Sequence, residues 1–227
     1  MLVWEVLQHT TSHTMTLTLK SVALYIAAAA TFVAVPSAYA TNFSLTVNGC
    51  SSGCGSGPFG NISVVQGGNI NTVIVTETLA AGNIYVKTGA GSALGYLLDK
   101  ATTVSGLGLN FTAGNSNGFS TFGTFATTIL CSACLQGASG STHISGPLSF
   151  SLFNATGLTP ANFIRNSNNF FFASDIGVPN GQGFDTGTVG TSVGTVTLTA
   201  TPEPGTLAML AGALGIAGVL RGKRFRA

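Results

Sequence analysis

The sequence predicts an all-β protein, with an antiparallel β-sandwich or jelly roll over residues 41–200. In six segments apolar and polar residues alternate or β-branched residues cluster, as expected of strands with one buried face. Dipeptides such as Asn48-Gly49, Asn117-Gly118 and Asn180-Gly181 predict turns between them. Strands follow one another closely, which leaves little room for crossover helices. The predicted strands are 43–47, 73–79, 84–87, 108–112, 148–153 and 193–198.

Two segments depart from this pattern. Residues 159–164 are predicted to be helical, with Thr159 as the N-cap and Pro160 in the first turn. The run Phe170-Phe171-Phe172 cannot place three consecutive rings on one face of a strand. We therefore expect one of these rings to be exposed or to cover an edge.

Two glycine-rich segments resemble enzyme motifs, and both are interpreted as loops. Residues 114–118 match the G-x-S-x-G pattern of a nucleophile elbow, but strands are predicted on both sides, whereas an elbow joins a strand to a helix. His143, the single histidine after residue 13, precedes Asp175, the reverse of the order that motif requires. Residues 89–95 have one residue too many for a dinucleotide fingerprint and lie in no βαβ unit.

The predicted domain carries little charge. Between residues 41 and 200 it has four acids and three bases, so the basic residues of the whole chain lie mostly at its ends. The sequence shows no basic patch, which argues against a nucleic-acid partner. Solubility is expected to come from Ser, Thr, Asn and backbone groups. The charged residues are Glu77, Lys87, Asp99, Lys100, Arg165, Asp175 and Asp185.

Four cysteines form two tight pairs, Cys50 with Cys54 and Cys131 with Cys134. Three disulfide connectivities are open, and local pairing is favoured because Gly53 allows the first loop to turn sharply. A four-cysteine zinc site is the alternative, although its first spacing is too long and export would oxidise the thiols. A thioredoxin-type role is less favoured, because no βαβ unit surrounds Cys131 and Cys134.

The N-terminal segment has the features of a secretory signal peptide. Lys20 precedes an apolar run over 22–35, and Ala38 and Ala40 form an A-x-A cleavage site. We expect signal peptidase to cut after Ala40. Residues 1–14 lack a positive charge, so translation is expected to start at Met15 and the signal peptide is assigned to residues 1–40.

The C-terminal segment, residues 201–227, has three parts in order. Pro202, Glu203 and Pro204 form an extended, accessible element. An uncharged apolar run over 206–220 is marginal as a membrane span, because its 15 residues are fewer than the roughly 20 of a relaxed span. A basic tail follows, and it is expected to stay in the cytoplasm. Its cations are Arg221, Lys223, Arg224 and Arg226.

These three parts resemble the PEP-CTERM sorting signal of Gram-negative bacteria. The resemblance implies transient insertion in the inner membrane and cleavage by exosortase. A second resemblance, to the ectodomains of PEP-CTERM proteins, is carried by the segment 171–176 and the Gly/Thr/Val-rich segment 186–200. It implies a secreted β-sandwich associated with extracellular polysaccharide and biofilm matrix, without catalytic residues.

Candidate binding residues in the domain are few. Asp175 and Asp185, with Asn180, are weak candidates for a calcium site; a solvated turn is the alternative. The same two aspartates would suit a glycoside hydrolase only if they lay about 5–10 Å apart across a cleft. Platforms for a sugar ring are limited to Tyr85, Tyr96 and 170–172, because Trp4 precedes the predicted cleavage site.

The sequence thus predicts an exported, non-enzymatic protein without a cofactor, sorted by exosortase to the cell surface or extracellular matrix. The alternative is a carbohydrate-binding module on the same β-sandwich.

Overall fold

The computed structural model describes residues 38–51, 53–88, 92–134, 142–191 and 199–201. These residues form one compact unit, Ala38–Thr201. It is all-β with antiparallel strands, as the sequence predicts, and one short 3₁₀ turn, η1 (Pro160–Asn162). Among the described residues, none forms a helix with the length and hydrophobicity needed to cross a membrane. Both predicted terminal signals lie outside the described residues, except for residues 38–40 and Thr201.

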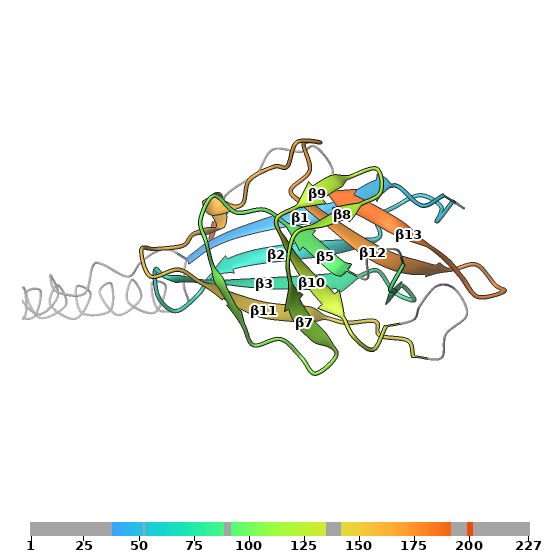
Figure 1. The fold of residues 1–227 in the computed structure, drawn as a ribbon, viewed down its shortest axis with the longest axis horizontal. Helices are drawn as coiled ribbons and strands as arrows, with labels where there is room; N and C mark the ends of the chain where they lie inside the picture. Colours follow the sequence, from blue (N-terminus) through green and yellow to red (C-terminus); the bar gives the residue numbers. More distant parts are fainter. Residues whose placement is uncertain (1–37, 52, 89–91, 135–141, 192–198, 202–227) are drawn as a thin grey trace, which may run out of the picture. The chain divides into compact units, whose positions relative to one another are not determined.

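Twelve strands belong to one large sheet, and β8 and β9 form a separate two-stranded sheet (Figure 1). The main order is β6-β11-β3-β2-β1-β13-β12-β5-β10-β7, with β4 paired to β12 and β14 to β1. The strands are β1 (Ala38–Asn48), β2 (Gly60–Gln66), β3 (Thr72–Leu79), β4 (Ile84–Tyr85), β5 (Ser92–Tyr96), β6 (Thr103–Ser105), β7 (Phe111–Gly114), β8 (Asn117–Phe119), β9 (Gly123–Phe125), β10 (Thr127–Cys131), β11 (Leu148–Phe153), β12 (Phe172–Pro179), β13 (Phe184–Thr191) and β14 (Thr199–Thr201).

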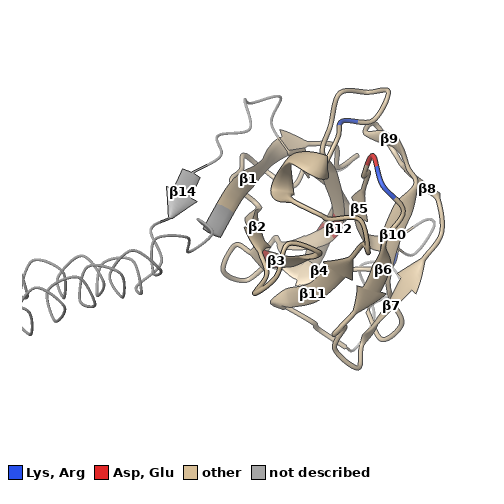
Figure 2. Ribbon diagram, turned by 90° about the vertical axis from the view of Figure 1, so that its left-hand side faces the viewer, with Lys and Arg blue, Asp and Glu red and all other residues tan. Residues whose placement is uncertain are grey.

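The sheet curls into a nearly closed barrel or sandwich. Its edge strands β6 and β7 are consecutive in the chain and are joined by residues 106–110. This short link holds the two edges near each other, and in Figure 2 the strands surround a common core. The core is continuous and mostly aliphatic and aromatic, with Phe150, Phe163 and Phe172 around Tyr96. Figure 2 also shows how few positions of the barrel are occupied by Lys, Arg, Asp or Glu.

Strand alternation explains most of the predicted elements. In β3 every second residue is buried, so the β-branched segment 73–79 has one face in the core. The predicted strands 43–47, 73–79 and 148–153 lie within β1, β3 and β11. The segment 159–164 contains η1, where Asn162 Oδ1 accepts a hydrogen bond from the Thr159 N–H at 2.7 Å. The predicted strand 193–198 lies outside the described residues.

Three local predictions are wrong. The segment 108–112 was expected to be a strand throughout, but β7 begins only at Phe111, after a turn closed by the Phe111 N–H and the Gly108 carbonyl. The predicted turn Asn117-Gly118 belongs to β8. The predicted loop 89–95 contains the start of β5, whose five residues are all buried. Because β5 is covered on both faces, it shows no alternation that a sequence pattern would reveal.

The three consecutive phenylalanines lie in two different apolar clusters. Phe172 is in the barrel core, and the Phe171 ring lies 5.1 Å from the Phe43 ring. Phe170 is half-buried outside the barrel, with its ring 4.8 Å from that of Phe122. One ring was expected to be exposed or to cover an edge; Phe170 is instead half-buried against the second cluster.

A hairpin made of β8 and β9, called here the aromatic hairpin, covers the outer face of the sheet. Its rings Phe119, Phe122 and Phe125 form a second apolar cluster with Ala173 of β12. The sheet face beneath them is rich in glycine. A Cβ atom at Gly190 would lie 2.4 Å from the Phe122 ring, and one at Gly95 would lie 2.4 Å from the Phe119 ring. The rings therefore lie directly on the backbone of the sheet.

A carboxyl group, that of Glu77, is buried in the barrel core. Glu77 is on the same face of β3 as Val73 and Val75 and is fully buried. Neither carboxyl oxygen has a hydrogen-bond partner among the described residues. Burial raises the pKa of Glu77 from 4.5 to about 8, and the nearby Ser174 and Tyr85 hydroxyls offset only part of this rise. Glu77 is therefore mostly protonated at neutral pH.

We predict that Gly190→Ala lowers the free energy of unfolding by about 1–3 kcal/mol, because the new methyl group overlaps the buried Phe122 ring. Urea unfolding monitored by fluorescence measures the change. Gly108→Ala is the matched control, because a Cβ atom at Gly108 meets nothing within 4 Å. Adding Phe122→Leu should restore part of the loss; equal effects of Gly190→Ala and Gly108→Ala would contradict this packing.

We also predict that the protein is more stable in acid. The folded pKa of Glu77 lies above its ordinary value, so its contribution to stability is fully present below about pH 4.5 and is lost as the pH rises through about 8. Glu77→Gln should remove a decline of up to about 1.4 kcal/mol per pH unit from this window. Urea unfolding at pH 5, 6, 7 and 8 gives the slopes.

The matched control for Glu77→Gln is Val75→Ala on the same buried face of β3. This substitution should lower stability by the same amount at every pH, because it removes no titrating group. Parallel pH profiles for Glu77→Gln and the wild-type protein would show that Glu77 does not titrate in this range.

Candidate functional site

A polar pocket of about 290 Å³ lies on the outer face of the sheet, beside the aromatic hairpin. Six parts of the chain meet there: the loop after β1, the segment after β4, strand β5, the aromatic hairpin, strand β12 and strand β13. Most of its lining residues are serine, threonine or glycine. The lining residues are Gly49, Ser51, Thr88, Ser92, Gly118, Phe119, Ser120, Asp175, Thr186, Gly187 and Thr188.

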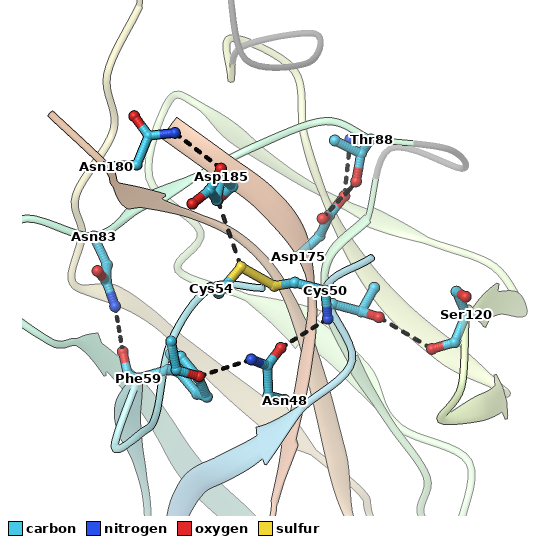
Figure 3. Close-up of a disulfide and its surroundings, with 12 residues drawn as sticks. Asn48, Cys50, Cys54, Phe59, Asn83, Thr88, Ser120, Asp175, Asn180 and Asp185 are labelled. Carbon is cyan, nitrogen blue, oxygen red and sulfur yellow. Dashed lines mark hydrogen bonds between the residues drawn. A yellow bond between two sulfur atoms is a disulfide. The ribbon is translucent and has the colours of Figure 1, made fainter. Parts of the chain in front are cut away.

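Asp175 is the acidic residue of this pocket. Its β12 neighbour Ile176 points into the core, so strand alternation places Asp175 on the outer face with Ala173. Only 2% of Asp175 is exposed. Thr88 donates its backbone N–H to Oδ2 at 2.8 Å, and its hydroxyl lies 2.6 Å from both carboxyl oxygens (Figure 3).

The ionisation of Asp175 reflects two opposing effects. Burial raises the pKa of Asp175 from 3.8 to about 6, and the hydrogen bonds from the Thr88 hydroxyl and N–H oppose this rise. The group is therefore mostly ionised at pH 7. A carboxylate has about four acceptor positions, and Thr88 supplies two donor groups. Acceptor positions of the Asp175 carboxylate, which lines the pocket, are therefore left unused by Thr88.

One wall of the pocket is held by the Cys50–Cys54 disulfide. Cys50 packs directly on Gly187, because a Cβ atom at Gly187 would lie only 2.7 Å from the Cys50 Cα. Asn48 braces the same loop, because its Oδ1 accepts from the Cys50 N–H at 2.8 Å and its amide donates to the Gly55 carbonyl at 2.7 Å. Figure 3 shows this loop lying against β13. The loop thereby fixes Gly49 and Ser51 at the pocket.

The opposite wall is the aromatic hairpin. The Thr188 hydroxyl donates to the Ser120 carbonyl at 3.0 Å and ties the hairpin turn to β13 (Figure 3). On β8, the Asn117 amide donates to the Ser92 hydroxyl at 2.7 Å. Phe119, 4% exposed, contributes its ring beside these polar groups. The wall is therefore fixed by hydrogen bonds as well as by the Phe packing.

The chemistry of the lining limits what the pocket can bind. Among the described lining residues there is no Lys, Arg or His, so no positive side chain faces an anion there. Hydroxyl groups both donate and accept hydrogen bonds, and Asp175 accepts. Across the described ranges, no three His, Cys, Asp or Glu side chains gather in a way that could hold a metal ion.

The predicted cysteine pairing is confirmed. Cys50 pairs with Cys54 at a Cα separation of 5.8 Å, and Cys131 pairs with Cys134 at 5.4 Å. Disulfides indicate an oxidising environment outside the cytoplasm. The second disulfide closes the end of β10, with both cysteines buried against the barrel core. With both pairs oxidised, the four-cysteine zinc alternative has no thiolates.

The residues predicted for a calcium or glycoside-hydrolase site, Asp175, Asn180 and Asp185, do not come together in one site. Asn180 donates its amide to Asp185 at 2.8 Å in the β12–β13 turn (Figure 3). In the antiparallel ladder of β12 and β13, Asp175 is opposite Thr188 and Asp185 is opposite Val178. Val178 follows Asp175 by three residues along β12. Residues opposite each other share a face of the sheet, and residues an odd number of positions apart on one strand point to opposite faces. The Asp175 and Asp185 carboxylates therefore lie on opposite faces and share neither one loop nor one cleft.

The predicted sugar platforms are wrong for both tyrosines. Tyr85 and Tyr96 are fully buried in the barrel core and offer no surface to a ligand.

Of the sorting residues, Pro202, Glu203, Pro204 and the cations of the basic tail lie outside the described residues. Ala38 and Ala40 lie at the start of β1, where they pair with Thr201 and Thr199 of β14.

The sequence did not reveal Thr88, Ser120 or Thr188 as pocket residues. They come from three separate parts of the chain, and Ser and Thr are abundant throughout it. No spacing rule links them, because the fold alone brings them together.

Comparisons with protein-family models, with curated proteins and with solved structures return no match for this chain.

We predict that Thr88→Val raises the pKa of Asp175 above its value of about 6, because the lost hydroxyl hydrogen bond stabilises the ionised form. Carbon NMR titration of the aspartate carboxyl signals measures this pKa. Thr46→Val, at an exposed position of β1 outside the pocket, is the control and should leave the titration unchanged. An unchanged or lower pKa in Thr88→Val would contradict the hydrogen-bond geometry.

Proposed function

We propose that this chain is an exported, non-enzymatic protein that exosortase sorts to the cell surface or extracellular matrix, where it is a component of exopolysaccharide or biofilm. The observation that carries the proposal is the ordered tail: Pro202-Glu203-Pro204, an uncharged apolar run and four cations. Two disulfides support it, because they form outside the reducing cytoplasm. For the barrel itself we infer an antiparallel β-sandwich of the jelly-roll kind.

The proposed processing has two cuts. Signal peptidase removes residues up to Ala40, and the apolar run then holds the chain in the inner membrane with its basic tail in the cytoplasm. Exosortase cuts at the PEP element, where Glu203 is the charge that the enzyme reads. The first cut also removes Ala38–Ala40, the residues that pair with Thr199–Thr201. The segment before Pro202 thereby loses that partner strand and becomes accessible to the second enzyme.

Carbohydrate binding is the second candidate function, and the polar pocket favours it. A cavity lined by hydroxyls, glycine backbone and one buried carboxylate matches a hydroxyl-rich ligand better than an apolar or anionic one. The two functions are compatible, because an exported matrix protein can hold polysaccharide.

Intact-mass measurement on protein recovered from cells with and without exosortase tests the sorting proposal. We expect a mass for residues 41 to about 204, with four thiol hydrogens missing, in exosortase-containing cells only. Glu203→Ala, or replacement of the four tail cations, should leave uncut protein in the membrane. Thr206→Ser, which changes the tail outside the motif, should be processed normally. Full-length C-termini in both strains would instead make the tail a permanent anchor.

A further inference from the structure

We propose that the pocket around Asp175 binds a single neutral sugar unit, with the Asp175 carboxylate accepting hydrogen bonds from two of its hydroxyls. This inference rests on the carbohydrate-binding candidate of the proposed function and gives that candidate a site and a ligand class. It needs no exosortase cleavage, so the two ideas can fail separately.

The size of the pocket limits the ligand to one unit. At about 290 Å³ the pocket lies at the lower end of the roughly 300–1,000 Å³ typical of small-molecule sites. It is enclosed by the disulfide loop on one side and the aromatic hairpin on the other. One ring fits, and the rest of a polysaccharide would extend out of the pocket.

The polar groups suit a polyhydroxyl ligand. Asp175 is ionised at neutral pH and lies at the base of the pocket, with acceptor positions that Thr88 does not use. Ser51, Ser120 and Thr186 also line the pocket, and a hydroxyl group can both donate and accept hydrogen bonds. A sugar unit presents several adjacent hydroxyls, which can satisfy a carboxylate and its neighbouring hydroxyls at the same time.

The pocket is also pre-formed. Thr188 is tied to the Ser120 carbonyl, and Ser92 accepts from Asn117, so these neighbours keep their positions without a ligand. Phe119 adds a small apolar surface that can contact the C–H face of a ring. Few side chains would need to be ordered on binding, which lowers the entropic cost.

Charge selects against acidic sugars. The carboxylate of Asp175 would repel a uronate, and no described lining residue carries a positive side chain to offset this repulsion. We therefore expect neutral hexoses to bind and glucuronate to be rejected.

The test is ligand-observed NMR on the full exported protein as recovered from cells, with glucose, galactose, mannose and glucuronate as separate probes at pH 7. At least one neutral hexose should bind with a dissociation constant on the order of 1 mM, as expected for one weakly buried ring. Glucuronate should show at least tenfold weaker binding. Calcium chloride alone is added as a separate probe.

Variants locate the site. Asp175→Asn keeps the shape of the side chain and should weaken hexose binding at least tenfold. Thr186→Val, which removes one lining hydroxyl and keeps its volume, should weaken binding about three- to tenfold; it keeps the test decisive if Asp175→Asn does not fold. Thr46→Val should bind as the wild-type protein does. Circular dichroism and the intact mass of the disulfide form establish folding of each variant.

Three outcomes would overturn the proposal. They are no binding of any neutral hexose at 20 mM, equal hexose affinity in Thr186→Val and the wild-type protein, and binding of calcium with no effect of sugars. Sorting is read independently from the intact mass, so a correctly cut protein that binds no hexose would leave the sorting proposal standing.

Discussion

The contact of phenylalanine rings with a glycine-lined sheet surface is the constraint on which the rest of the structure depends. Phe122 lies over Gly49 and Gly190, and Phe119 lies over Gly95, at distances that no Cβ atom would permit. This packing holds the aromatic hairpin against the outer face of a barrel whose inner face is already filled. The hairpin in turn forms a wall of the polar pocket, so that wall depends on two positions of the sheet and one of the loop after β1 that lack side chains.

A second constraint is the burial of carboxyl groups in a domain with little charge. Glu77 and Asp175 are two of the four acids between residues 41 and 200, and both are almost fully buried. Burial raises the pKa of each, but to different extents, about 8 for Glu77 and about 6 for Asp175. Desolvation is the larger cause for both groups. It is opposed at Asp175 by two well-formed hydrogen bonds from Thr88, and at Glu77 only in part by the Ser174 and Tyr85 hydroxyls. The same residue chemistry thus gives a neutral group inside the barrel and an ionised group in the pocket at neutral pH.

The sequence predicts the parts of the fold that depend on local periodicity. β3 and β11 alternate clearly, and the short cysteine spacings favour the local pairs that the structure contains. β5 was missed because a strand buried on both faces has no alternation, and Gly95 there reflects contact with Phe119 rather than a turn. The candidate site was predicted only through Asp175. Its other residues share no spacing, and their proximity is a property of the curled sheet.

The position of the pocket in the barrel relates it to the two terminal segments. Ala38 pairs with Thr201, so both segments join the barrel at the same end of β1. Gly49 and Ser51 follow the other end of β1, and a strand of eleven residues spans about 33 Å. Within the barrel, the β1–β14 pairing and the loop that lines the pocket therefore lie at opposite ends of β1. Neither cut of the proposed sorting scheme removes a residue that lines the pocket, so the proposed sugar site has the same lining before and after processing.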